Sequence, residues 1–324
     1  MRYRDFGRTG LKVSELVFGC GMVGGLVIEK DDATRQAAID RALTSGINWF
    51  DTAPMYGAGK SEAALGRLLA GETRPFHIST KVNVDARDLD DLRGQIERSL
   101  EASLTRLKRD SVTLLQLHNP LGAETRERTL AADEVLKVGG VLDVLADLKR
   151  QGLCGHIGFT GLGERDAVLR VIRSGRVESA QVYYNLLNPS ASATPPATWP
   201  VHDFGGVFQA CADHGVAAMV IRVFSAGVIA TDARKGLEQP LTAGDTVESE
   251  TAKARAVLAA LGDRHGTRAQ AAVRFALAEA RASCVVLGIG EPEHLAEALA
   301  AEAMGPLPSE GLEAVRGVYA RGLG

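Results

Sequence analysis

The sequence contains few cysteines, and they are not arranged as metal ligands. Cysteine occurs only at four widely separated positions in 324 residues, with no Cys-x-x-Cys pair and no histidine at ligand spacing: Cys20, Cys154, Cys211 and Cys284. Such a distribution indicates neither a zinc site nor a disulfide framework. We therefore expect four buried, reduced thiols that carry no thiol chemistry and a protein without a metal site.

Long apolar runs and an excess of one charge are also missing. No apolar run approaches the roughly 18 residues that span a bilayer, and the start, MRYRDFGRTG, is too polar for a signal-peptide core. The formal net charge is -3, without a long run of one sign, so nothing indicates nucleic acid or an anionic membrane as partner. We expect a cytoplasmic protein that binds a small soluble molecule.

A Pro/Ser-rich linker that would divide the chain is absent as well. With 324 residues and 45% apolar content, the chain can bury one large core or two ordinary ones, so length does not choose between them. Eight short apolar runs are typical of strands: residues 13–19, 47–53, 76–82, 112–119, 154–161, 179–185, 216–223 and 282–290. Between them lie segments with helical spacing of apolar residues, such as 31–46, 61–71, 92–108 and 139–152.

The eightfold alternation predicts the fold class. Strands that are continuously apolar are typical of a parallel sheet covered by helices on its outer face. Eight such units favour an α/β fold of the (β/α)8 TIM-barrel type, as a single domain over residues 1–324. We expect residues 3–14, with Gly10 between two short strand-like pieces, to form an N-terminal β-hairpin that closes the bottom of the barrel.

Two long segments interrupt the repeat, at residues 188–206 and 225–250. They follow the predicted sixth and seventh strands, so both should lie on the barrel face that carries the active site. Long loops of this kind are functional lids or surface insertions.

Residues 13–25, VSELVFGCGMVGG, match the pattern G-x-G-x-x-G through Gly19, Gly21 and Gly24. In a dinucleotide-binding Rossmann unit the third glycine leads into a helix, and an acidic residue follows about 20 residues later. Here GLVIEK intervenes and Asp51 lies 27 residues after Gly24. We interpret the match as accidental, and the glycines as sites where the backbone approaches a ligand or another chain segment closely.

Polar residues at the predicted strand ends are few. The second strand ends in Asp51, with Tyr56 five residues on; the third carries Lys81 and the fourth ends in His118. Each alone has an ordinary explanation, as a turn cap, a packed ring, an ion-pair partner or a core histidine. Because consecutive barrel strands are neighbours, the four can converge on one pocket, and buried charges on adjacent strands need to be paired.

This quartet suits proton transfer to a carbonyl oxygen. A tyrosine that donates a proton needs a pKa, near 10 when unperturbed, that is brought towards neutrality. At about 4 Å and a dielectric of about 20, Lys81 would favour the phenolate of Tyr56 by about 4 kcal/mol, before burial and Asp51 oppose it. Asp51 would keep Lys81 charged, and His118 would position the carbonyl or share the proton transfer.

The chain resembles the aldo-keto reductases, barrel enzymes that use a nicotinamide cofactor without a Rossmann domain. The resemblance extends from FGRTGLKVSELVFG through GINWFDTAPMYGAGKSEAALGRLL, STKV, LLQLHNP and HIGFTGL to LGIGEPEHLAEAL. It is closer to sugar, aldose or pyridoxal dehydrogenase-like branches than to steroid reductases. The family's catalytic Asp, Tyr, Lys and His fall on Asp51, Tyr56, Lys81 and His118. The resemblance implies hydride transfer between NAD(P)H and an aldehyde, ketone or sugar-type substrate.

The same resemblance implies where the cofactor lies across the barrel mouth. The expected contacts to its nicotinamide half include Asp51 and the following residues: Gly21, Met22, Thr160, Gly161 and Gln181. The family usually has Ser-Asn where this chain has Thr160-Gly161, so one carboxamide contact is lost or replaced. Arg222 stands near a position where an aromatic ring is common; it would contact the pyrophosphate or form a loop ion pair.

The residues expected near the adenosine half of the cofactor bear on the choice between NADP and NAD, which the sequence leaves open. The resemblance implies contacts there from these residues: Gly288, Ile289, Gly290, His294 and Glu297. The cations that hold a 2'-phosphate in NADP-dependent members are largely missing, and Glu291 and Glu293 would oppose a phosphate at the nearby helix N-terminus.

Two other functions fit the same residues. A Schiff-base aldolase would use Lys81 as the nucleophile at a strand end. A regulatory module would hold the nicotinamide cofactor without turnover, although the intact quartet argues against it. The oligomeric state cannot be read from one sequence.

Overall fold

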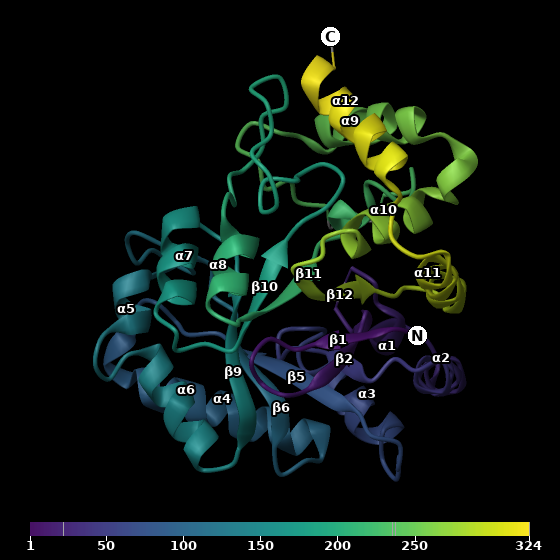
Figure 1. Cartoon of the computed structure of the whole chain (residues 1–324). Helices are drawn as coiled ribbons and strands as arrows, with labels where there is room; N and C mark the ends of the chain where they lie inside the picture. Colours follow the sequence, from purple (N-terminus) through teal and green to yellow (C-terminus); the bar gives the residue numbers. More distant parts are fainter. Residues whose placement is uncertain (22, 235, 237, 324) are drawn as a thin grey trace.

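The computed structural model describes residues 1–21, 23–234, 236 and 238–323, and its centre is a closed parallel barrel (Figure 1). Around the barrel each strand pairs with the next: β3 (Leu16–Gly19), β4 (Trp49–Asp51), β5 (His77–Val82), β6 (Val112–Leu117), β9 (Cys154–Gly161), β10 (Ser179–Tyr183), β11 (Ala217–Ile221) and β12 (Ala282–Gly288), which closes onto β3. All eight strands lie within the predicted runs. The (β/α)8 barrel is confirmed, and a Rossmann sheet is excluded.

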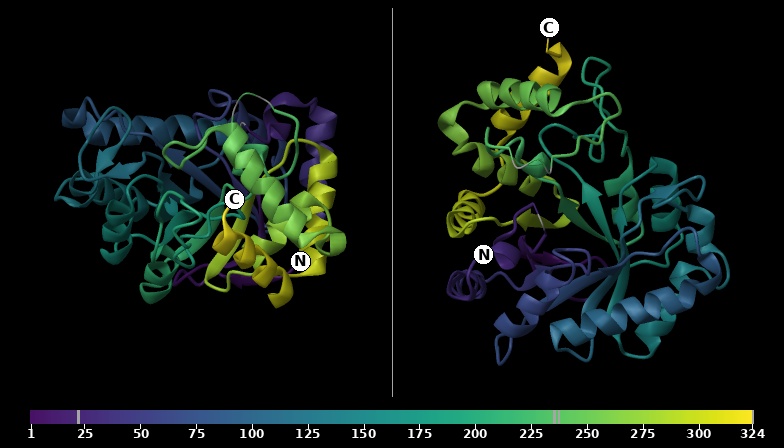
Figure 2. Two further views of the ribbon diagram at one scale, coloured as in Figure 1. Left: turned by 90° about the horizontal axis from the view of Figure 1, so that it is seen from above. Right: turned by 180° about the vertical axis from the view of Figure 1, so that it is seen from behind.

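Helices cover the outside of the barrel (Figures 1 and 2). They are α1 (Leu26–Glu29), α2 (Asp32–Thr44), α3 (Lys60–Leu68), α4 (Leu92–Leu107), α5 (Ala132–Leu136), α6 (Val141–Arg150), α7 (Arg165–Arg173), α8 (Val207–Asp213), α9 (Val247–Leu261), α10 (Arg268–Leu277), α11 (Pro292–Met304) and α12 (Ser309–Arg321), with short 3-10 turns η1 (Leu89–Asp91), η2 (Ser225–Gly227) and η3 (Asp263–His265). None of the described helices is long and apolar enough to cross a membrane.

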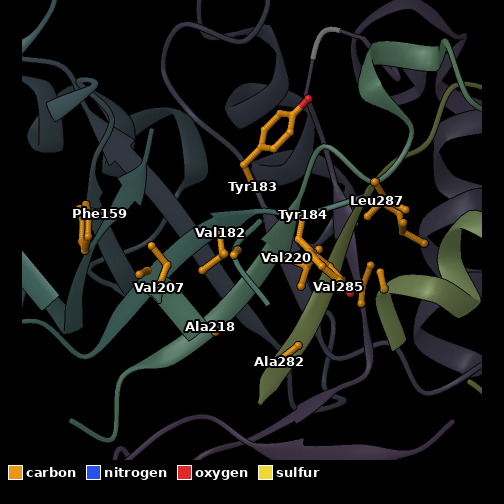
Figure 3. Packing of buried hydrophobic residues seen from close by; sticks show 14 of the residues in the cluster. Phe159, Val182, Tyr183, Tyr184, Val207, Ala218, Val220, Ala282, Val285 and Leu287 are labelled. Atoms are coloured by element: carbon orange, nitrogen blue, oxygen red, sulfur yellow. The ribbon is translucent and has the colours of Figure 1, made fainter. Parts of the chain in front are cut away.

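The two faces of each strand bury side chains in different places, which explains the continuous apolar runs. Outward-facing side chains pack under the helices; Figure 3 shows Val182, Val220 and Val285 of three neighbouring strands in this cluster. Inward-facing side chains fill the lower barrel in a separate small cluster that includes Trp49 and Met219. The polar residues that alternate with the outer core therefore face the barrel interior.

The N-terminal hairpin closes the barrel bottom, as expected. Strands β1 (Tyr3–Asp5) and β2 (Lys12–Ser14) pair antiparallel. Phe6, between them, is fully buried, and its ring centroid lies 4.5 Å from that of Trp49 on the inner face of β4. The floor of the barrel is therefore packed with side chains, and a ligand must enter from the carboxyl ends of the strands.

The two predicted long loops are present after β10 and β11, and hydrogen bonds join them to each other. The backbone N–H of His202 donates to Thr242 Oγ1 at 3.0 Å, and Lys253 reaches both Asp245 and the carbonyl of Pro200. The second loop is shorter than expected. Thr246 caps α9 by accepting from Ser249, so residues 247–250 are helical.

The segment between β6 and α6 was not foreseen. It contains a pair of two-residue strands, β7 (Leu121–Gly122) and β8 (Leu130–Ala131), followed by α5. Strands this short have no hydrophobic periodicity that a sequence could display. The segment matters because Asn119, just ahead of it, donates a hydrogen bond to the carbonyl of Arg128, which fixes this loop beside the barrel mouth.

The four cysteines are free and buried, as predicted. Burial raises the pKa of the Cys154 and Cys211 thiols to about 12, so both stay protonated near neutral pH. No group of three His, Cys, Asp or Glu side chains in the described chain is placed to hold a metal ion.

Candidate active site

Four polar side chains meet at the carboxyl ends of β4, β5 and β6. Asp51 ends β4, Tyr56 follows it in the next loop, Lys81 lies near the end of β5, and His118 follows β6 directly. The strands are hydrogen-bonded neighbours, with Asp51 opposite Ser79 and Lys81 opposite Gln116. The structure therefore brings together the four residues that the sequence singled out.

Lys81 and Asp51 form a buried ion pair. Lys81 Nζ lies 2.7 Å from Asp51 Oδ2 and 2.8 Å from the carbonyl oxygen of Thr52. Lys81 is fully buried and Asp51 is 3% exposed. Burial is the largest single effect and would lower the pKa of Lys81, but the charges and hydrogen bonds of Asp51 and Tyr56 together leave that pKa above its ordinary value. Lys81 is therefore an ammonium at neutral pH.

The second oxygen of Asp51 is held from two other strands. Ser79 donates to Asp51 Oδ1 at 2.7 Å, and Gln181 Nε2 of β10 donates to the same oxygen at 3.1 Å. Gln181 Oε1 in turn accepts a 3.4 Å hydrogen bond from Thr160 of β9. The carboxylate thus connects Lys81 through hydrogen bonds to Gln181 and Thr160, two of the expected cofactor residues.

Tyr56 is half-buried against the other three. Its ring centroid lies 5.0 Å from Lys81 Nζ and 5.9 Å from that of His118, whose ring meets it edge-on at 84°. The expected fall of its pKa is wrong. Burial, the largest cause, raises the pKa of Tyr56, Lys81 lowers it, and Asp51 raises it again, so it ends above 10. The phenol is protonated at neutral pH.

His118 is neutral. Burial, followed by the charges of Lys81 and Arg128, lowers its pKa to about 3. Its Nδ1 atom is buried without a hydrogen-bond partner in the part of the chain that the structure describes. A neutral imidazole here can donate a hydrogen bond, but it does not deliver a positive charge.

The three glycines of the G-x-G-x-x-G pattern have two different roles in the structure. A Cβ on Gly19 would lie 2.7 Å from the carbonyl oxygen of Leu287, and one on Gly24 would lie 2.6 Å from the nitrogen of Ile289, so both glycines permit tight packing against the β12 end. A Cβ on Gly21 would meet only the Tyr56 ring, at 3.7 Å. Gly21 therefore borders the phenol. The expected contact from Met22 lies outside the described residues.

Arg222 follows β11 in the left-handed region, with φ of +61°. Asn185 Nδ2 donates to its carbonyl oxygen at 2.8 Å and holds the backbone there. The side chain is half-buried, and among the described residues no carboxylate lies within ion-pair distance of its guanidinium. The described residues therefore contain no direct ion pair of Arg222, although its charge acts against burial in setting the pKa of Glu250.

The residues expected at the adenosine end form a separate group at the end of β12. Gly288 is exposed, Ile289 is buried and accepts a 3.0 Å hydrogen bond from Leu26 N, and Gly290 packs against Gly24. His294 and Glu297 lie on α11. Glu297 accepts a hydrogen bond from Thr267, and Gly161 packs tightly against the backbone of Gln181.

Acidic groups predominate where β12 meets α11. Lys30 Nζ lies 2.6 Å from Glu291. This hydrogen bond, together with the charges of Glu29 and Glu293, raises the pKa of Lys30. Glu291 is thus paired with Lys30, and the charges of Glu29 and Glu293 also act on this ammonium.

Sequence reasoning missed several residues of this site, among them Ser79, Asn83 and Gln116. Ser79 and Lys81 alternate on the same face of β5. Gln116 lies two positions before His118, and Asn83 is the first residue after β5, two positions beyond Lys81. Asn83 Oδ1 and both amide atoms of Gln116 are buried without hydrogen-bond partners in the described chain. The alternation of strand side chains was the signal that could have found them.

Comparisons with known proteins agree with this geometry. Residues 15–320 match the profile of the Aldo/keto reductase family. The chain is 27% identical over 321 residues to pyridoxal 4-dehydrogenase from Microbacterium luteolum, covering 90% of each, and 28% identical over 249 residues to D-threo-aldose 1-dehydrogenase from a Pseudomonas species, covering 68% of this chain and 69% of the relative. A solved aldo-keto reductase from Bacillus halodurans superimposes with a TM-score of 0.73 at 21% identity, over 98% of this chain and 96% of that one.

Proposed function

The chain belongs to the aldo/keto reductase family, and from this premise we propose that it interconverts a carbonyl and an alcohol with NAD(P)H, using Tyr56 as the proton donor in reduction and acceptor in oxidation. The observation that supports this assignment best is the buried Lys81–Asp51 pair beside a protonated tyrosine and a neutral histidine. A nicotinamide cofactor, when bound, supplies or accepts the hydride.

The protein's own groups manage the proton and orient the carbonyl. The Tyr56 hydroxyl protonates the carbonyl oxygen as negative charge develops there, and Lys81 stabilises the phenolate that remains. Asp51 keeps Lys81 charged and fixed in place through its 2.7 Å contact. The neutral His118 donates a hydrogen bond that positions the carbonyl oxygen. In oxidation Tyr56 accepts the alcohol proton instead.

The residues present fit a nicotinamide dinucleotide. Thr160 and Gln181 offer hydroxyl and amide groups at the barrel mouth for a carboxamide. Arg222 offers an unpaired guanidinium for a pyrophosphate, with respect to the described carboxylates. The exposed Gly288 leaves the backbone accessible at the end of β12.

NAD is the cofactor that the charges favour. The 2'-phosphate of NADP would approach the end of β12, where Lys30 is paired with Glu291 and Glu29 and Glu293 stand nearby. We expect NADPH to bind at least about tenfold more weakly than NADH, which is about 1.4 kcal/mol of repulsion. Titration with each nucleotide, followed by protein fluorescence, measures the ratio.

A charge variant sharpens this test. Glu291→Gln removes one carboxylate and releases Lys30, so NADPH should gain affinity while NADH changes little. Glu310→Gln, which removes a carboxylate paired with Arg264 on the exposed face of α12, is the matched control. Tighter binding of NADPH than NADH to the unaltered protein contradicts the assignment.

The substrate is proposed to be a small hydroxylated carbonyl compound or its alcohol. The two relatives compared above are named for pyridoxal and for an aldose, both of which carry hydroxyl groups. The direct test follows reduced nicotinamide absorbance with pyridoxal, aldoses and simple aldehydes in both directions.

Borohydride trapping decides between this function and a Schiff-base aldolase. We expect no covalent labelling of Lys81, because an ammonium held by Asp51 is a poor nucleophile. Substrate-dependent labelling of Lys81 without nicotinamide turnover would instead support the aldolase. Nucleotide binding without turnover of any tested carbonyl or alcohol would support the regulatory module.

A further inference from the structure

Asn83 lies next to His118 at the barrel mouth. Strands β5 and β6 are in register through Val82 and Leu117, and His118 N donates to the carbonyl of Val82 at 2.8 Å, which continues the ladder by one step. Asn83 and His118 are the residues that directly follow the two strands. Asn83 also comes two positions after Lys81 in the sequence.

The amide of Asn83 lacks a partner in the described protein. Its Oδ1 atom is buried without a hydrogen bond, as is Nδ1 of the adjacent His118. The nearby Asn119 behaves differently: its side chain bonds to Val84 N, to Val84 O and to the carbonyl of Arg128. A buried amide oxygen is costly to leave unpaired. Asn119 stabilises neighbouring loops through its hydrogen bonds, whereas the buried oxygen of Asn83 makes no such contact in the described chain.

Asn83 lines a cavity of about 760 Å³ whose wall contains sequence neighbours of the proposed catalytic residues but not those residues themselves. Met55, next to Tyr56, and Arg128, whose charge helps to lower the pKa of His118, line it too. This volume lies within the range of sites for small molecules. Its wall is mostly polar, with Asn83, Gln95 and Asn119 among arginine and acidic side chains.

We propose that Asn83 determines substrate specificity by hydrogen-bonding a hydroxyl group on the carbon next to the reacting carbonyl. The inference rests on the proposed function and refines its substrate class to α-hydroxy aldehydes and ketones. A carbonyl oxygen held between Tyr56 and His118 places its neighbouring carbon beside Asn83. The buried oxygen accepts the hydroxyl proton and gains the partner that the protein does not supply.

Sites that hydrogen-bond a substrate hydroxyl reject the analogue that lacks it, because their own polar group then stays unpaired. 2-Hydroxypropanal and propanal form a suitable pair, because they differ only in the hydroxyl group next to the carbonyl. We expect kcat/KM with NADH to be at least about 100-fold higher for 2-hydroxypropanal.

The variant Asn83→Leu has nearly the same shape and removes the acceptor. It should lower kcat/KM for 2-hydroxypropanal by about 100-fold and leave kcat/KM for propanal within about threefold. Turnover of propanal also shows that the variant is folded. Asn83→Ala should give the same ratio if the bulk of leucine is not the cause. Arg93→Leu, on α4 outside the cavity lining and paired with Glu97 and Asp147, is the matched control and should preserve the wild-type ratio.

The outcomes separate the two proposals. If both aldehydes are reduced at similar rates by the wild type, or if Asn83→Leu slows both equally, the role of Asn83 is refuted and the proposed oxidoreductase function stands. If the wild type reduces neither aldehyde, nor any carbonyl of the panel, the proposed function itself fails.

Discussion

Replacing Tyr56 with phenylalanine is expected to lower kcat by about 10³-fold, within the range that general acid catalysis contributes. The ring and its packing against His118 remain, so only the proton donor is lost. Lys81 cannot take over, because it is held by Asp51 and Thr52 behind the phenol. Nicotinamide affinity should change by less than about threefold, since the assigned contacts to the cofactor lie elsewhere.

Pre-steady-state hydride transfer and a fluorescence titration with NADH measure the two quantities separately. Tyr3→Phe is the matched control, because it removes a hydroxyl that donates to the Gly46 carbonyl at the barrel bottom, far from the proposed site. Tyr3→Phe should retain wild-type turnover. Wild-type kcat in Tyr56→Phe would overturn the assignment of the proton donor.

Replacing Asp51 with asparagine is expected to destabilise the protein by about 3–5 kcal/mol, because a fully buried ammonium loses its counter-charge. Turnover should fall as well, since Lys81 then favours the neutral amine and stabilises the phenolate of Tyr56 less. Urea unfolding gives the free energy, and steady-state kinetics give the activity.

The double variant Asp51→Asn/Lys81→Met separates stability from chemistry. Removing both charges leaves no unpaired ion in the barrel, so the free energy of unfolding should recover most of the loss. Activity should not recover, because the cation beside Tyr56 is gone. Equal instability of the single and double variants would show that the ion pair is not what Asp51 contributes.

Sequence periodicity was sufficient for the barrel but not for its connections. The eight strands are largely buried on both faces because one face packs under the helices and the other fills the barrel, and the resulting run of mostly apolar residues is local in the sequence. The β7–β8 pair has no such pattern. The boundary at Thr246 depended on a capping hydrogen bond to Ser249 rather than on hydrophobic spacing.

The proposed catalytic quartet was recognisable because Asp51, Lys81 and His118 stand at strand ends, where a barrel topology makes neighbours of distant segments. The direction of the pKa shift of Tyr56 could not be predicted from the sequence. Its direction depends on whether burial or the ammonium has the larger effect, and burial is a property of everything packed around the ring. Likewise Asn83 became a candidate only when its oxygen proved to be buried without a partner.

The sequence by itself determined the order of strands and helices and the identity of the groups available at the barrel mouth, since both follow from residue type and spacing along the chain. Tertiary structure alone decided which of those groups are charged, which amides are already satisfied, and that the charges of Glu291, Glu29 and Glu293 act on Lys30. Protonation and hydrogen-bond satisfaction depend on distance and dielectric between residues far apart in sequence, and only the folded chain sets those distances.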